Sequence, residues 1–153
     1  MSLLAAIRPD SWDLPLFLHI IGAMTLVGAT TLAATSLAAA WRSGSLALTR
    51  LGYRALLLGV IPAWIVMRLS ADWIADKEGL EDADLAWIDI GFMVTDPGSL
   101  ILIAATVLGG LAARRADEPG DNPMITARIA TVLVGLLLVL YLVAVWAMTA
   151  KPV

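Results

Sequence analysis

Four long apolar stretches, separated by short polar links, constrain this chain more than any other feature. They cover residues 14–41, 51–74, roughly 85–113 and 124–150. A helix needs about 20 mostly apolar residues to cross a bilayer, and each stretch is about that long or longer. Sixty per cent of the 153 residues are apolar and 15% are charged, whereas soluble domains have about 45–50% and about 25%. The sequence therefore predicts an all-α bundle of four transmembrane helices in a lipid bilayer.

Two prolines indicate where these helices depart from regular geometry. Pro62 lies inside the second stretch and predicts a kink, because proline cannot donate the backbone hydrogen bond of a continuous helix. In the third stretch, Asp96-Pro97 has the pattern of a helix start, with aspartate as the N-cap and proline at the first position. We expect either a helix over 96–113 with a separate interfacial segment over 85–94, or one longer helix kinked at Pro97.

The distribution of basic residues predicts the orientation of the chain. Six of the ten Lys and Arg residues lie at the link between the first two stretches or at the link between the last two. The positive-inside rule places these links, near 42–50 and 114–123, in the cytoplasm and both termini outside. The remaining link is rich in acidic residues, and we expect it to form a solvated cap on the outer side. The first stretch is longer than the apolar core of a signal peptide, so we expect it to stay as a helix.

Three ionisable residues fall in the outer half of the apolar stretches: His19, Arg68 and Asp96. Ionisable side chains are costly inside a bilayer, so each is a candidate for a functional or structural role. Arg68 can extend to the interface, pair with Asp72 one turn later, or pair with Asp96 in the third stretch. Trp64 lies four residues before Arg68, on the same helical face. His19, Arg68, Asp96 and Trp64 are therefore expected to form a polar cluster that binds a ligand or fixes the bundle.

His19 is the only histidine, and the chain has no cysteine, so a metal or haem site would need methionine as a further ligand. Thioethers suit Cu(I), and methionine can be an axial ligand of haem iron. The candidate ligands at one level of the bilayer are His19, Met67, Met93 and Met148. Haem b and copper are the cofactors that this set suggests. Methionine is also a common apolar filler, so the same residues can be purely structural.

No catalytic constellation stands out in the sequence. It has no phosphate-binding glycine loop, no zinc-type histidine pair and no serine elbow motif, so we expect no catalytic residues. The net charge of −3 argues against a nucleic-acid partner. Small residues recur at a spacing of four, as at Ala105, Gly109 and Ala113, which favours close helix packing and a homo-oligomer or larger membrane complex.

Three segments resemble a family of small integral membrane proteins of unknown function, with members of actinobacterial type. They are LFLHIIGA at 16–23, LGVIPAWIVMR at 58–68 and YLVAVWAMTAKP at 141–152. The resemblance covers all four apolar stretches and implies a bacterial cytoplasmic membrane. More distantly, the histidine of the first stretch resembles that of copper-resistance D-type and haem-binding four-helix membrane proteins. Those proteins use more than one histidine, whereas this chain has only His19.

Three functions follow from these observations. The favoured one is a non-enzymatic accessory or interaction subunit, because catalytic motifs are lacking and small-residue faces are present. The second is a haem- or copper-binding protein that uses His19 and a methionine, with Arg68 beside a haem propionate. The third is a small transporter with Arg68 and Asp96 at its polar site, although transporter sites usually lie near the middle of the bilayer.

Overall fold

The computed structural model describes residues 13–79, 86–115 and 124–151. The helices are α1 (Asp13–Ser43), α2 (Leu46–Ala55), η3 (Leu56–Val60), α3 (Ile61–Glu78), α4 (Ala86–Arg115) and α5 (Met124–Ala150). Because α2, η3 and α3 follow one another without a break, they form one long helix. Four helices are thus long and apolar enough to cross a membrane. The predicted all-α bundle of four helices is confirmed for the described residues.

The second span begins earlier than the sequence predicts and contains the expected irregularity. Its first turn is capped by Ser45, whose side chain accepts a hydrogen bond from the backbone N–H of Leu48. The five-residue π segment η3 ends just before Pro62, and the N–H of Ile61 bonds to the carbonyl of Leu56, five residues back. The departure from α geometry that Pro62 predicts therefore lies in the turn that precedes it.

The third span is one continuous helix, because α4 runs through Pro97. A helix that starts at Asp96, with a separate interfacial segment over 85–94, is wrong, and the single longer helix is the alternative that the structure has. The carboxylate of Asp96 accepts a hydrogen bond from Arg68 of α3 and does not act as an N-cap. Leu85 itself lies outside the described residues.

Small residues share the interior of the bundle with fully buried leucines such as Leu37 and Leu56, and further large apolar side chains cover its outside. Ala33, Ala105 and Ala130 are fully buried, whereas Leu58 and Leu100 are about 70% exposed. Such an arrangement would be unfavourable in water and suits a protein whose surface contacts lipid. The exposed leucines are therefore expected to face acyl chains.

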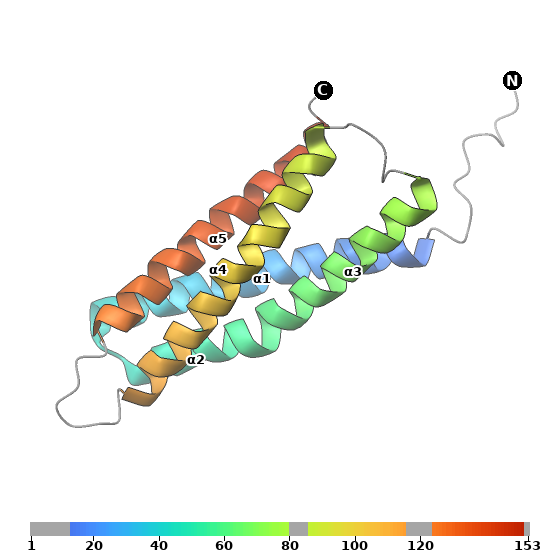
Figure 1. Cartoon of the computed structure of the whole chain (residues 1–153). Helices are drawn as coiled ribbons and strands as arrows, with labels where there is room; N and C mark the ends of the chain where they lie inside the picture. The colour runs from blue at the N-terminus through green and yellow to red at the C-terminus, as the bar shows by residue number, and fades with distance from the viewer. Residues whose placement is uncertain (1–12, 80–85, 116–123, 152–153) are drawn as a thin grey trace, which may run out of the picture.

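The four helices form two pairs that join at one end and separate at the other (Figure 1). α1 packs along α3, and α4 packs along α5. At the joined end, where α2 lies, Gly110 of α4 sits against the ring of Tyr53 on α2. The opposite, open end holds the start of α1, the end of α3, the start of α4 and the end of α5 (Figure 1).

Candidate functional site: a cavity at the open end

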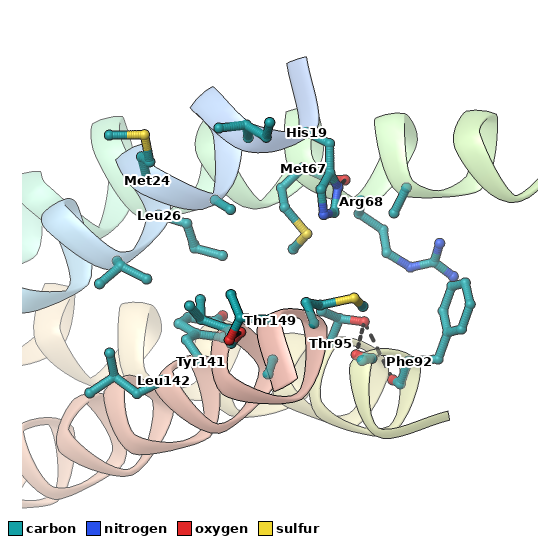
Figure 2. A pocket seen from close by; sticks show the side chains of 18 of the residues that line it. His19, Met24, Leu26, Met67, Arg68, Phe92, Thr95, Tyr141, Leu142 and Thr149 are labelled. Carbon is teal, nitrogen blue, oxygen red and sulfur yellow. Dashed lines mark hydrogen bonds between the residues drawn. The ribbon is translucent and has the colours of Figure 1, made fainter. Parts of the chain in front are cut away.

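A cavity of about 640 Å³ lies between the two helix pairs towards the open end. Side chains of α1 and α3 form one wall, and side chains of α4 and α5 form the other (Figure 2). Apart from His19, Arg68 and three hydroxyl-bearing residues, the lining is apolar or glycine. Its volume falls within the range of about 300–1,000 Å³ that is typical of sites for small organic ligands.

Exposed residues of α1 and α5 line part of the cavity. Ile20 and Met24 of α1 line it and are also exposed on the outer surface, as are Leu142 and Val145 of α5. Large apolar residues of a membrane-spanning helix that are exposed in this way are expected to face lipid. The mouth of the cavity therefore lies on the surface that acyl chains contact.

His19 is held in one orientation by the neighbouring helix. Its Nδ1 lies 3.2 Å from the backbone carbonyl oxygen of Met67. A carbonyl only accepts, so Nδ1 carries a proton and donates; in the neutral form of the ring, Nε2 is then the unprotonated nitrogen. The close approach of α1 and α3 here depends on Gly22, where a Cβ atom would lie 2.9 Å from the backbone nitrogen of Met67.

Arg68 connects α3 to α4 on another side of the cavity. Its Nε donates to Asp96 Oδ1 at 2.9 Å, and its Nη1 donates to Asp72 on its own helix. The guanidinium also lies over the ring of Phe92, 4.8 Å from the centroid, in cation–π geometry. One cation and two carboxylates leave this cluster with a net charge of −1. The pairing alternatives that the sequence leaves open are thus both realised.

Among the described residues that line the cavity, one hydroxyl has no partner. Thr95 and Thr149 donate to carbonyls one turn earlier in their own helices. The hydroxyl of Tyr141 is buried and has no hydrogen-bond partner among the described residues, and the whole residue is 2% exposed. The indole nitrogen of Trp64 is likewise buried without a partner, but Trp64 does not line the cavity.

The predicted site residues come together only in part. His19, Arg68, Met67 and Met148 line the cavity, and Asp96 adjoins it through its ion pair with Arg68. Trp64 and Met93 are not among the lining residues, and Met93 is exposed on the outer face of α4. The described residues contain no group of three or more His, Cys, Asp or Glu side chains that could hold a metal ion.

Sequence reasoning missed Tyr141. The available signal was a lone phenol in the middle of the most apolar span, from Ile125 to Ala150. A hydroxyl at that depth needs a partner, because lipid offers none. The same reasoning that singled out His19 and Arg68 would have singled out this tyrosine.

No protein-family model matches the chain, and neither a curated protein nor a solved structure shows significant similarity to it.

Proposed function

We propose that this multi-pass membrane protein binds a lipid-soluble molecule in the cavity at its open end. The observation that carries the proposal is the position of the cavity mouth, between lipid-exposed residues of α1 and α5. A molecule dissolved in the bilayer could enter there without crossing water. The apolar walls match an acyl or isoprenoid chain, whose burial requires no polar partners.

Two glycines offer a matched test of this proposal. Gly28 lines the cavity, and a Cβ atom there would meet nothing within 4 Å; Gly135 has the same open surroundings on α5 but does not line the cavity. Gly28→Leu should occupy part of the cavity without disturbing the helices, and Gly135→Leu should only add a side chain at a helix surface. Both variants add the same apolar group to a helical glycine.

The measurement is native mass spectrometry of protein released from mild detergent, with identification of the small molecules that stay bound. We expect the wild type and Gly135→Leu to retain the same lipid-soluble species and Gly28→Leu to lose most of it. Equal retention by all three proteins, or none by the wild type, would refute the proposal. Retention of a partner polypeptide in the cavity would instead favour the accessory-subunit hypothesis.

A non-enzymatic accessory or interaction subunit, in a bacterial cytoplasmic membrane with both termini outside, stays a prediction. In support of that orientation, Arg42, Arg50, Arg54 and Arg114 belong to the helix ends that meet at the joined end. Asp72, Asp76 and Asp89 belong to those at the open end, where Lys77 and Lys151 also lie. The loop over 116–123 lies outside the described residues. Labelling of engineered cysteines at Ser43 and Lys151 with an impermeant reagent would test this, and only position 151 should react from outside.

A second candidate function is Cu(I) binding, which a specific observation favours. The only histidine, with Nε2 free in its neutral form, lines the same cavity as Met67 and Met148. An imidazole and two thioethers form a soft donor set. Met93 is then the control: replacement of Met67 or Met148 by leucine should weaken Cu(I) binding in a chelator competition, and Met93→Leu should not. The haem alternative stays a prediction, and Arg68, its expected propionate partner, is already paired with two carboxylates.

A further inference from the structure

We infer that the ligand of this cavity is an uncharged lipid whose polar end carries a carbonyl oxygen, which accepts a hydrogen bond from the Tyr141 hydroxyl. This inference rests on the proposed function and gives the chemical class of the ligand. It draws on three features: the hydrogen-bond partners of the hydroxyl groups in the lining, the net charge beside the cavity, and Nε2 of His19.

The hydroxyl groups point to a hydrogen-bond acceptor in the ligand. Both threonines on the wall donate to backbone carbonyls of their own helices, so their protons are already used. Tyr141 packs near Gly98 of α4, and no described residue offers a backbone carbonyl or other partner for its proton. Buried hydroxyl groups are almost always hydrogen-bonded in folded proteins. An acceptor oxygen on the ligand would satisfy the phenol.

The charge beside the cavity argues against an anionic headgroup. Of the Lys and Arg residues that the structure describes, Arg68 alone lines the cavity, and it already donates to both Asp72 and Asp96. The cluster of these three residues carries a net charge of −1. A carboxylate or phosphate would be repelled by the net negative charge of this cluster. A carbonyl oxygen meets no such penalty.

His19 offers the ligand a second polar contact, in which the protein accepts the hydrogen bond instead of donating it. Because Nδ1 donates to the Met67 carbonyl, Nε2 of the neutral ring can only accept a hydrogen bond. Beside the guanidinium of Arg68, the lining thus offers an unpartnered donor, the Tyr141 hydroxyl on α5, and an acceptor, His19 Nε2 on α1, within largely apolar walls (Figure 2). A lipid-soluble quinone uses the donor in its oxidised form, and its hydroxyl groups can use the acceptor in its reduced form. A diacylglycerol, with ester carbonyls and one hydroxyl, has the same two capabilities.

The experiment compares ligands with and without a carbonyl group on two variants in nanodiscs. The ligands are decylubiquinone, dioctanoylglycerol and decylbenzene, with decylbenzoate as the anionic counterpart, each competed against a fluorescent lipid bound to the full-length protein. Tyr141→Phe removes only the hydroxyl, and Trp64→Phe removes the other unpartnered buried donor, which lies outside the cavity. Because Tyr141→Phe deletes an unpartnered buried group, its melting temperature should equal or exceed that of the wild type.

We expect Tyr141→Phe to weaken binding of the carbonyl ligands about 2- to 10-fold, the usual effect of losing one neutral hydrogen bond. Binding of decylbenzene should not change, and Trp64→Phe should match the wild type for every ligand. If decylubiquinone loses more affinity than dioctanoylglycerol in Tyr141→Phe, the natural ligand is a quinone. If dioctanoylglycerol loses more, the natural ligand is a glyceride. Unchanged carbonyl binding in Tyr141→Phe, or tighter binding of decylbenzoate than of decylbenzene, would overturn the inference and leave the proposed function standing. If no ligand displaces the fluorescent lipid, the proposed function itself is wrong.

Discussion

The joined end and the open end of the bundle differ in whether their side-chain contacts connect the two helix pairs or stay within one pair. At the joined end, the contacts cross from one helix pair to the other: Arg128 of α5 stacks over Trp41 of α1, and Gly110 of α4 meets Tyr53 of α2. At the open end, most such contacts stay within a pair, as where Lys151 stacks over Trp87 beside the α4–α5 contact.

Arg68 is the exception at the open end. Its side chain reaches from α3 to Asp96 on α4, although the backbones of these helices approach at few points. The comparison indicates that close backbone approach holds the pairs together at one end, while a single long polar side chain spans the gap at the other. A cavity can exist at the open end because the joined end fixes the two pairs.

The largest effect is expected from a side chain forced between the pairs at the joined end. A Cβ atom at Gly110 would lie 3.0 Å from the ring of Tyr53, whereas one at Gly28 meets nothing within 4 Å. Gly110→Leu should therefore lower the free energy of unfolding by about 1–3 kcal/mol, with a clear loss in melting temperature, and Gly28→Leu should leave it nearly unchanged. Equal effects of the two variants would remove the distinction between the ends.

A similar or slightly smaller effect is expected within the α1–α3 pair. At Gly22 a Cβ atom would lie 2.9 Å from the backbone nitrogen of Met67 and 3.0 Å from its Cα, and backbone cannot move aside as a side chain can. Gly22→Ala should destabilise the protein by about 1–2 kcal/mol, and Gly28→Ala should stabilise it by up to about 1 kcal/mol because alanine favours a helix. Thermal unfolding in detergent measures both, and a stable Gly22→Ala protein would contradict the close α1–α3 contact.

The smallest of the three effects is expected from the ion pair across the open end. Asp72 and Asp96 are more than half exposed, so solvent weakens their attraction to Arg68. A double-mutant cycle of Arg68→Met and Asp96→Asn should give a coupling of about 0.5–1 kcal/mol. High salt should reduce it, since exposed charges are screened. A coupling of zero would mean that Arg68 does not tie the pairs together.

Much of the fold could be predicted from the sequence, because the length and apolar character of each stretch decide whether it spans a bilayer. The pairing of Arg68 with Asp96 was also foreseeable, since both lie at one depth and burial of either alone is costly. The course of α4 through Pro97 was harder to predict, because tertiary contact gave the Asp96 carboxylate a partner other than the helix start.

The depth of a residue in the bilayer was not enough to identify the residues that line the cavity. Met93 lies close in depth to Gly91, which lines the cavity, but two residues along a helix turn it by about 200° to another face. The cavity itself depends on the tilt between helix pairs, and apolar periodicity carries little information about tilt when every face of a helix is apolar. A lone phenol in the most apolar span was a signal for Tyr141, but only the tertiary structure shows that its hydroxyl has no partner among the described residues.

The most direct test of the two-ended structure is a pair of distances measured by pulsed electron spin resonance in nanodiscs. The chain has no cysteine, so introduced cysteines give specific labels. One pair joins Ser43 to Ile125 at the joined end, and the other joins Leu14 to Thr149 at the open end; all four residues are exposed. We predict a clearly longer distance between α1 and α5 at the open end than at the joined end (Figure 1). Equal, short distances at both ends would mean that the pairs run parallel, and would contradict the cavity and the function proposed for it.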